Sequence, residues 1–500
     1  MKRHEHQKDH RAALARIDAV IQQGPFTASW ESLKNFKVPD WYLDDKFGIF
    51  IHWGLYCVPA FGNEWYARNM YQQGSKEFEH HLKTYGQHKD FGYKDFIPMF
   101  TAKDYDPKAW ANLFKEAGAR FVMPVAEHHD GFPMYHSDIT DWCAGKMGPK
   151  RDLVGELADA VRAEGLVFSA SSHRAENWWF YDGGLSFDSD VSDPANAGIY
   201  GPPQPASPNV GHSSEEWRSK TWQPVPDTAF LEDWLVRTCE IIDKYRPQVL
   251  WFDWWIEQEV FQPYLQKLAA YYYNCGAEWG LGVAINHKHD SFPVGTTVFD
   301  IERGQLNHIR EYFWQNDTSV SKNSWGYIRQ HDYKPVQWII QDLVDIVSKN
   351  GALLLNIGPK ADGTLPEEEQ AILLEMGKWL SINGEAIYHT RPCDIYGEGP
   401  TDVPEGSFTD TKRKDFSPED IRFTRKGNYL YATLLAWNKG SVTIKSLAEG
   451  SSVAASSIKK ISLLGDESAL EFSQSAEGLK VSLPDTPPCE HAFVLRLELT

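Results

Sequence analysis

The stretch DPKAWANLFKEAGARFVMPVAEHHD, residues 106–130, holds the unit from which the fold is built: an amphipathic helix, an apolar strand and a polar end. Asp106 can cap the helix, and Pro107 suits its first turn. The helix places four apolar residues on one face: Trp110, Leu113, Phe114 and Ala117. Because such a face packs against a sheet, the stretch is typical of one β/α unit.

The same alternation of strand-like and helical segments continues along most of the chain. Seven apolar runs predict strands: GIFIHWG from Gly48, RFVMPVAEHHD from Arg120, LVFSASSH from Leu166, QVLWFDWW from Gln248, LGVAINHK from Leu281, TVFDIERG from Thr297 and ALLLNIGP from Ala352. We expect an eighth, less distinct strand around Tyr312 to Thr318. Helical stretches between them include RDLVGELADAVRAEG, TAFLEDWLVRTCEIIDKY, QPYLQKLAAYYYNC and PVQWIIQDLVDIVSKNG, the last ended by Gly351. This pattern predicts an α/β fold, a (β/α)8-like (TIM) barrel.

The pattern changes near residue 390. Short runs with alternating apolar residues follow: NYLYATLLAW, SVTIKSL, KKISLLG, LKVSLP and AFVLRLEL. A period of two is typical of half-buried antiparallel strands, so we predict a C-terminal antiparallel β-sandwich. We expect residues 1–388 to form the barrel with an N-terminal helical extension, and residues 389–500 to form the sandwich. A role in covering the barrel surface is favoured for the sandwich over a role in binding carbohydrate.

Charge and composition narrow the classes of partner and compartment. A net charge of -19 disfavours nucleic acid and anionic membranes as partners, because both repel an acidic protein. The first twenty residues are charged and lack an apolar core, so we expect a cytoplasmic protein, with a processed secreted form left open. The six cysteines lack CxxC spacing, which signals neither a disulfide scaffold nor a zinc site. A homo-oligomer is possible on these data.

Polar and ionisable residues follow the apolar strands at their carboxyl ends. In a (β/α)8 barrel these ends meet on one face, where the catalytic site lies. We therefore expect one pocket to receive the residues at six strand ends: His52 and Trp53; His128, His129 and Asp130; Ser172 and His173; Asp253; Asn286, His287 and Lys288; and Glu302 and Arg303.

Two carboxylates among these residues predict glycoside hydrolysis. A carboxylate at the tip of a buried strand, such as Asp253, costs desolvation free energy and needs a reason to be there. A helix N-cap or an ion pair would be structural reasons. Hydrolysis of a glycosidic bond needs two carboxyl groups, about 5–5.5 Å apart in a retaining enzyme. Asp253 and Glu302 follow different strands that open to the same face, so they form the predicted pair.

The histidines admit a second interpretation, a metal site made of His52, His128, His129 and Asp253. Adjacent residues on a strand point to opposite faces, so only one of His128 and His129 can face a given metal unless the strand has ended. Neither HxH nor HExxH spacing occurs. We favour histidines that bind sugar hydroxyls, and expect at least one of the adjacent pair to be a core histidine. Glu64 and Trp65 can clamp a sugar or belong to a surface loop.

Taken together, these segments resemble glycoside hydrolase family twenty-nine, the α-L-fucosidases. The resemblance covers the barrel in order: KFGIFIHWGLYCVPAFGNEWYARNMY, GARFVMPVAEHHDGF, HSDITDWCAG, RDLVGELADAVRAEGL, VLWFDWW, KNSWGY, LVDIVSKNGALLLNIGPKADGTLPEEE and WLSINGEAIYHTRP. It implies a (β/α)8-like domain followed by a β-sandwich, a fucosylated oligosaccharide or glycoconjugate as substrate, retention of configuration and no metal cofactor.

The resemblance also implies roles for individual residues. Asp253 matches the nucleophile and Glu302 the general acid/base, with Glu311 as a weaker alternative. The fucose-binding set is His52, Glu64, Trp65, His128, His129 and Trp251. The chain departs from the family at three places: Ser172, His173, Glu176 and Trp178 reshape one wall of the site; Lys288 replaces an arginine; and Gln315 replaces a carboxylate.

The sequence therefore predicts a retaining exo-α-L-fucosidase that acts by double displacement through a fucosyl-enzyme. Three alternatives remain at this point. The first is a retaining glycosidase for a related sugar such as a galactoside, the second is a noncatalytic fucose-binding protein, and the third is a metallohydrolase.

Overall fold

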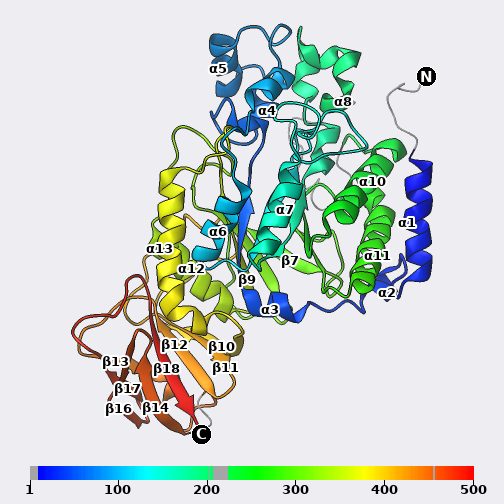
Figure 1. The fold of residues 1–500 in the computed structure, drawn as a ribbon. Helices are drawn as coiled ribbons and strands as arrows, with labels where there is room; N and C mark the ends of the chain where they lie inside the picture. Colours follow the sequence, from blue (N-terminus) through cyan, green and yellow to red (C-terminus); the bar gives the residue numbers. More distant parts are fainter. Residues whose placement is uncertain (1–9, 202, 206–222, 454–456) are drawn as a thin grey trace.

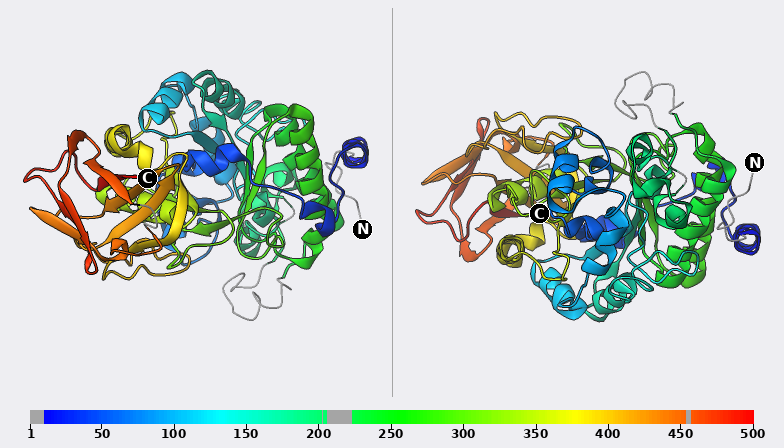
Figure 2. Two further views of the ribbon diagram at one scale, coloured as in Figure 1. Left: turned by 90° about the horizontal axis from the view of Figure 1, so that it is seen from below. Right: turned by 90° about the horizontal axis from the view of Figure 1, so that it is seen from above.

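The computed structural model describes residues 10–201, 203–205, 223–453 and 457–500 (Figure 1). Residues 1–9, which begin the charged N-terminal segment discussed above, lie outside the described residues. Parallel strands surrounded by helices form one part of the molecule, and antiparallel sheets form the other. Both views in Figure 2 place these sheets at the end of the molecule opposite the N-terminal helix.

In the described part of the chain, eight parallel strand positions close into a barrel. The third position is divided into two short strands that both pair with the second, and the last strand pairs with the first. The expected (β/α)8-like barrel is confirmed, including its eighth strand. The strands are β1 (Phe47–Ile51), β2 (Phe121–Glu127), β3 (Val167–Phe168), β4 (Ala170–Ser172), β5 (Val249–Phe252), β6 (Ala284–His287), β7 (Val298–Glu302), β8 (Trp314–Ser319) and β9 (Gly351–Ile357).

Helices surround the barrel, and three short ones, α4 (Tyr66–Asn69), α5 (Lys76–Thr84) and α8 (Ala197–Tyr200), lie over its carboxyl end (Figure 1). The longer helices are α1 (Arg11–Gln23), α6 (Pro107–Glu116), α7 (Leu153–Ala163), α10 (Thr228–Tyr245), α11 (Gln262–Trp279), α12 (Val336–Ser348) and α13 (Glu367–Asn383). The other short ones are α2 (Trp30–Leu33) and α3 (Asp40–Asp45). The 3-10 turns are η1 (Leu55–Cys57), η2 (Tyr93–Met99), η3 (Arg174–Trp178), η4 (Asp182–Ser186), η5 (Asp190–Ser192), η6 (Pro194–Asn196), η7 (Glu259–Phe261), η8 (Gly384–Ala386) and η9 (Lys445–Leu447).

The start of α6 and the end of α12 can be compared with the boundaries predicted from the sequence. The carboxylate of Asp106 accepts hydrogen bonds from the first backbone N–H groups of α6, and Pro107 is its first residue, as expected. The expectation that Gly351 ends α12 is wrong. The helix ends at Ser348, and Asn350 takes the left-handed conformation, with φ +70°. Gly351 instead begins β9, where a side-chain carbon would lie 2.7 Å from the ring of Trp314.

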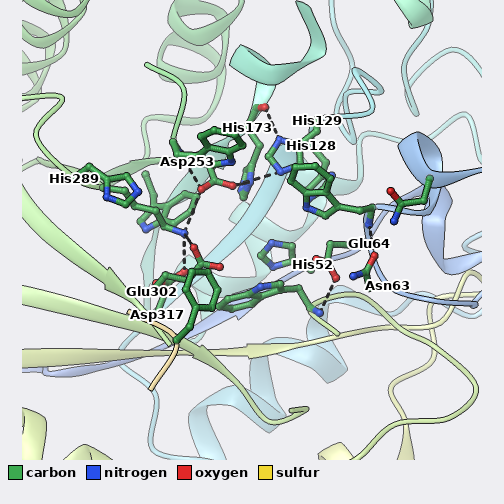
Figure 3. A pocket seen from close by; sticks show the side chains of 17 residues that line it. His52, Asn63, Glu64, His128, His129, His173, Asp253, His289, Glu302 and Asp317 are labelled. Atoms are coloured by element: carbon green, nitrogen blue, oxygen red, sulfur yellow. Dashed lines mark hydrogen bonds and ion pairs between the residues drawn. The ribbon is translucent and has the colours of Figure 1, made fainter. Parts of the chain in front are cut away.

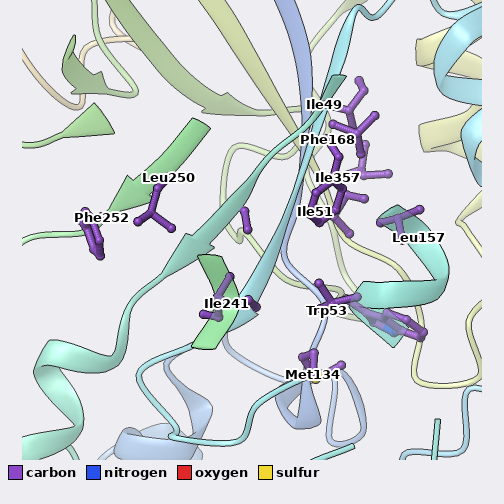
Figure 4. Close-up of a cluster of buried hydrophobic side chains, with 14 of the residues drawn as sticks. Ile49, Ile51, Trp53, Met134, Leu157, Phe168, Ile241, Leu250, Phe252 and Ile357 are labelled. Carbon is purple, nitrogen blue, oxygen red and sulfur yellow. The ribbon is translucent and has the colours of Figure 1, made fainter. Parts of the chain in front are cut away.

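Residues along each barrel strand alternate between two buried layers. Leu250 and Phe252 of β5 belong to the outer layer that packs against the helices (Figure 4), whereas Trp251 belongs to the cluster inside the barrel. Burial of each such side chain stabilises the fold by roughly 1.5–3 kcal/mol. Asp253 follows β5 directly and has the same parity as Trp251, so the alternation directs it to the interior at the mouth of the barrel.

The C-terminal part forms two antiparallel sheets with their own hydrophobic core, which confirms the predicted sandwich. The larger sheet has the order β10-β11-β12-β18-β14-β15 and packs through β10 and β11 against α12. The smaller has the order β13-β17-β16. Their strands are β10 (Arg391–Glu398), β11 (Ile421–Lys426), β12 (Tyr429–Leu434), β13 (Ser441–Ile444), β14 (Ile458–Leu463), β15 (Asp466–Ala469), β16 (Phe472–Ser475), β17 (Gly478–Ser482) and β18 (Phe493–Leu499).

Two further properties follow from the described residues. All six cysteines are free, and five of them are buried. Among the helices that the structure describes, none combines the length and the apolar character needed to cross a membrane.

Candidate active site

A pocket of about 570 Å³ opens at the carboxyl ends of the barrel strands (Figure 3). Its volume falls in the range of small-molecule sites. All ten predicted site residues line it: His52, Glu64, Trp65, His128, His129, His173, Trp251, Asp253, Lys288 and Glu302. The barrel therefore brings together residues that lie far apart in the sequence.

One lysine contacts both carboxylates on one side of the pocket. The ammonium nitrogen of Lys288 lies 3.2 Å from Oδ1 of Asp253 and 2.5 Å from Oε2 of Glu302. These two oxygens therefore cannot be farther apart than the sum of the two distances, about 5.7 Å. Asp317, which follows on β8, lies 3.6 Å from the same nitrogen. We call Asp253, Lys288, Glu302 and Asp317 the carboxylate side.

The two carboxylates occupy different electrostatic environments. Burial alone would raise the pKa of Asp253, but Lys288 and two histidines outweigh it and hold this pKa well below the usual range. Burial raises the pKa of Glu302, and the neighbouring Asp253 raises it further, against the opposing effect of Lys288. One carboxyl group is thus kept ionised while the other favours its proton, which is the division of roles that acid and nucleophile require.

Lys288 itself remains charged in spite of its burial. Burial alone would lower its pKa, but Asp253 and Asp317 together with Glu302 raise it well above the usual value. Its ammonium group also lies 4.8 Å from the centroid of the Trp251 ring, which adds a cation–π contact. The sequence identified Lys288 as a substitute for an arginine, and the structure places it between the two carboxylates.

The opposite side of the pocket carries uncharged histidines: His52, His128 and His173, which we call the histidine side. Burial is the main cause that lowers the pKa of each ring, to about 4 for His173. Nδ1 of His52 lies 2.7 Å from the amide oxygen of Asn356, so Nδ1 donates and Nε2 is left as an acceptor. Neutral rings held in this way suit hydrogen bonds to uncharged hydroxyl groups.

His173 connects the histidine side with Asp253. Its Nδ1 lies 3.2 Å from Oδ2 of Asp253, and its Nε2 lies 3.0 Å from the hydroxyl of Ser171. Since a carboxylate only accepts hydrogen bonds, Nδ1 carries the proton and Nε2 accepts from Ser171. The ring therefore steadies the orientation of Asp253 without adding a charge.

His129 is the exception among the histidines because it lies between two carboxylates. Nδ1 is 3.0 Å from Glu176 of η3, and Nε2 is 3.4 Å from Asp253. Burial alone would lower the pKa of His129, but Glu176 and Asp253 raise it to about 9. Burial raises the pKa of Glu176 to about 7, against the effect of His129. At neutral pH the His129 imidazolium adds a second positive charge beside Asp253.

Glu64 and Trp65 lie in the pocket wall, not in a surface loop. Oε2 of Glu64 accepts a hydrogen bond of 2.9 Å from the backbone N–H of Trp325, which leaves Oε1 to accept from a ligand. The Trp65 ring lies 5.3 Å from that of His129. With Trp251 and Trp325, Trp65 gives the pocket the aromatic surface that sugar rings pack against.

Some predicted residues lie elsewhere. Glu311 is exposed and does not line the pocket, whereas Gln315 is buried inside the barrel and bonded to Asp300 at 2.6 Å. Trp178 packs against Phe230 outside the pocket, and Ser172 does not line it either. Both His128 and His129 line the pocket, because β2 ends at Glu127 and strand alternation no longer applies.

Sequence reasoning missed several residues of the pocket. Asp317 could have been found, since it follows Gln315 with the same parity on β8. Trp325 lies in the quoted segment KNSWGY, but its position next to Glu64 depends on loop packing. Phe408 comes from the loop between β10 and β11, and nothing in its local sequence predicts contact with the barrel.

Two groups of pocket residues have ligand atoms close enough to hold a metal ion. They are His52, His128 and His173, and His129, His173 and Asp253, each with ligand atoms within 4.8 Å of one another. His173 belongs to both groups, and its two nitrogens are already bonded to Asp253 and Ser171. The absence of a metal requirement remains a prediction, which unchanged turnover in the presence of chelators would support.

Comparisons with known proteins agree with one another. A family described as Alpha-L-fucosidase matches residues 13–385, and one described as Alpha-L-fucosidase C-terminal domain matches residues 413–498. The chain is 32% identical to tissue alpha-L-fucosidase of Rattus norvegicus over 491 residues, which cover 94% of this chain and 92% of the rat protein. It is 31% identical to the Homo sapiens tissue enzyme over 493 residues, which cover 94% and 91%. A crystal structure of Thermotoga maritima alpha-fucosidase with a mechanism based inhibitor superimposes with a TM-score of 0.73, at 31% identity, covering 95% of this chain and 100% of that chain.

Proposed function

Because the chain belongs to the α-L-fucosidase family of glycoside hydrolases, we propose that it is a retaining exo-enzyme that releases terminal α-L-fucose through a fucosyl-enzyme. The observation that carries this proposal is the contact of one ammonium group with both carboxylates. The resulting limit of about 5.7 Å between the two oxygens fits a retaining pair and is shorter than the roughly 6.5–9.5 Å of inverting enzymes.

In the first step, Asp253 attacks the anomeric carbon while Glu302 gives its proton to the departing glycosidic oxygen. A bond forms between the carboxylate oxygen and the sugar, and the bond to the leaving group breaks. The lowered pKa of Asp253 keeps the nucleophile ionised, and the raised pKa of Glu302 favours the protonated form that the acid needs. In the second step, Glu302 takes a proton from water, which then opens the fucosyl-enzyme.

Lys288 suits both steps because the negative charge moves between the two groups that it contacts. Before reaction the charge lies on Asp253, and after the first step it lies on Glu302, since Asp253 has become an ester. An ammonium group within 3.2 Å of one carboxylate and 2.5 Å of the other stabilises either state without moving far. Preorganised charge of this kind is a large contribution to catalysis.

The histidine side and Glu64 account for recognition of a sugar with free hydroxyl groups. His52 offers a ring nitrogen and Glu64 a carboxylate oxygen, both as acceptors. Fucose bears a methyl group where many hexoses have a hydroxymethyl group, and the rings of Trp251 and Trp325 provide apolar surface for it. Apolar contact rejects an added hydroxyl only weakly, so we expect modest discrimination against the corresponding galactoside.

The test of the proposed nucleophile is chemical rescue. The Asp253→Gly variant with an activated aryl α-L-fucoside should be inactive alone, and added azide should restore turnover and yield a fucosyl azide of inverted configuration. Turnover of the variant at the wild-type rate without azide would remove Asp253 from this role.

The acid/base role of Glu302 has its own test, based on leaving-group dependence. Glu302→Ala should lose far more activity on a fucoside with a poor leaving group than on one with an activated aryl group, because only the poor leaving group needs protonation. Glu311→Ala serves as the matched control and should retain wild-type activity on both. Equal losses for Glu302→Ala on the two substrates would contradict the assignment.

A further inference from the structure

We propose that Phe408, on the loop of residues 399–420 between β10 and β11, is the binding platform for the leaving group of the substrate. The leaving group is a sugar or aryl ring that stacks its apolar face on the exposed phenyl ring. This inference rests on the proposed function and deepens it, because it assigns a subsite beyond the scissile bond to a residue of the C-terminal part.

The loop is fixed directly to the strand that carries the proposed acid. The backbone N–H of Phe408 donates to the carbonyl oxygen of Glu302 at 2.9 Å. The next two N–H groups, of Thr409 and Asp410, donate to the carbonyl oxygen of Arg303 at 2.8 and 2.9 Å. The position of Phe408 is therefore tied to that of Glu302 by main-chain contacts that do not depend on side-chain rotamers.

A buried ionic cluster anchors the base of the loop. Oδ2 of Asp410 lies 2.5 Å from the ammonium group of Lys334, 2.9 Å from the hydroxyl of Thr318 and 3.4 Å from the guanidinium of Arg303. Charges buried in this way need close partners, and loss of one partner leaves the others uncompensated. The loop is thus held in one place against β7 and β8, so its tip is a defined part of the pocket.

Phe408 itself has two properties that packing does not explain. The residue is 55% exposed although it lines the pocket, and its φ is +58°, in the left-handed region that a bulky residue rarely adopts. A single exposed apolar side chain is ordinary on a protein surface. An exposed ring on a strained backbone, fixed beside a proposed catalytic group, is typical of a ligand contact.

The position of Phe408 relative to the bond that is cleaved identifies the ligand. His52, His128 and Trp251 surround the space for the sugar that is cleaved, and Glu302 must reach the oxygen that departs. Whatever is attached to that oxygen lies beyond Glu302, where the Phe408 loop meets the pocket. Aromatic rings bind the C–H faces of sugar rings and the faces of aryl groups, so the subsite favours ring-shaped leaving groups.

The test compares substrates that have a ring in the leaving group with one that has none. Phe408→Ala should raise KM about 3- to 10-fold for a fucosyl disaccharide and for 4-nitrophenyl α-L-fucoside. It should leave kcat/KM unchanged for α-L-fucosyl fluoride, which has no ring to stack. Phe408→Trp should retain the wild-type KM for the ring-bearing substrates. Phe472→Ala, which removes an exposed phenylalanine of β16 outside the pocket, is the matched control and should leave the kinetic constants for all three substrates unchanged.

Three results have distinct meanings. An equal loss on the fluoride and on the ring-bearing substrates, or no loss on either, would overturn the role of Phe408 alone. Failure of the wild-type protein to hydrolyse any of these fucosides would overturn the proposed function, and the subsite with it. A loss confined to the ring-bearing substrates and restored by tryptophan supports the assignment.

Discussion

Both sides of the pocket are largely buried, yet the histidine side is neutral and the carboxylate side is charged. His52, His128 and His173 have lowered pKa values because burial meets little opposing charge, whereas Lys288 and Asp253 are held ionised by each other. Burial alone therefore does not set the charge of a group; its partners do. Under the proposed function, the neutral side binds hydroxyl groups and the charged side cleaves the bond.

The largest effect is expected from Lys288→Met, which removes the cation of the carboxylate side. The kcat should fall about a hundredfold or more, since a preorganised charge is lost. Lys288 lowers the pKa of both Asp253 and Glu302, so its removal raises both. Both limbs of the pH profile of the residual activity should therefore move to higher pH. Lys288→Arg is the control that retains the charge. If both limbs keep their wild-type positions in Lys288→Met, Lys288 does not set the pKa values of the carboxylate side.

A smaller effect is expected from His52→Phe on the histidine side. The variant loses one hydrogen-bond acceptor for a sugar hydroxyl, so KM should rise about tenfold while kcat changes less. Because the ring of His52 is neutral over the working pH range, the limbs of the pH profile should stay where they are. A shift of the limbs as large as in Lys288→Met would mean that His52 is charged, against this account.

Glu176→Gln tests His129, the pocket histidine whose pKa two carboxylates raise. Glu176 raises the pKa of His129, so the amide should let burial lower that pKa below its wild-type value of about 9. His129 then loses its proton at lower pH, and the positive charge beside Asp253 is lost as pH rises through the new value. The ratio of variant to wild-type kcat/KM should thus decline with rising pH, to about one fifth at neutral pH. A ratio independent of pH would show that His129 is neutral in the wild type.

The smallest effect is expected on the melting temperature of variants at Phe408. Phe408→Gly removes the strain of a left-handed backbone, whereas Phe408→Ala keeps it. The glycine variant should melt about 1 °C above the alanine variant. Both should lose the same affinity for ring-bearing leaving groups. Equal melting temperatures would show that the loop changes its backbone conformation in the alanine variant.

The sequence predicted the parts of the molecule that local rules determine. Strand parity and strand ends place Asp253, Lys288 and Glu302 at one face of the barrel, and this placement depends only on where each strand stops. The restriction of alternation to strand residues also explains His128 and His129, which both line the pocket because β2 ends before them, at Glu127.

Residues set by long-range packing could not be predicted in this way. Asn356 fixes the ring of His52 from another strand, and Phe408 reaches the pocket only because its loop docks on β7. The prediction that Gly351 ends a helix is wrong, because the close approach of Trp314 is what requires a glycine there. These cases depend on contacts between segments that no local pattern in one sequence encodes.

The most direct measurement of the central claim is the anomeric configuration of the first product. Hydrolysis of an aryl α-L-fucoside followed by proton NMR before mutarotation should yield α-L-fucose, since two displacements at Asp253 restore the starting configuration. Initial formation of β-L-fucose would contradict the account, because it would mean that water attacks directly and that Asp253 forms no bond to the sugar.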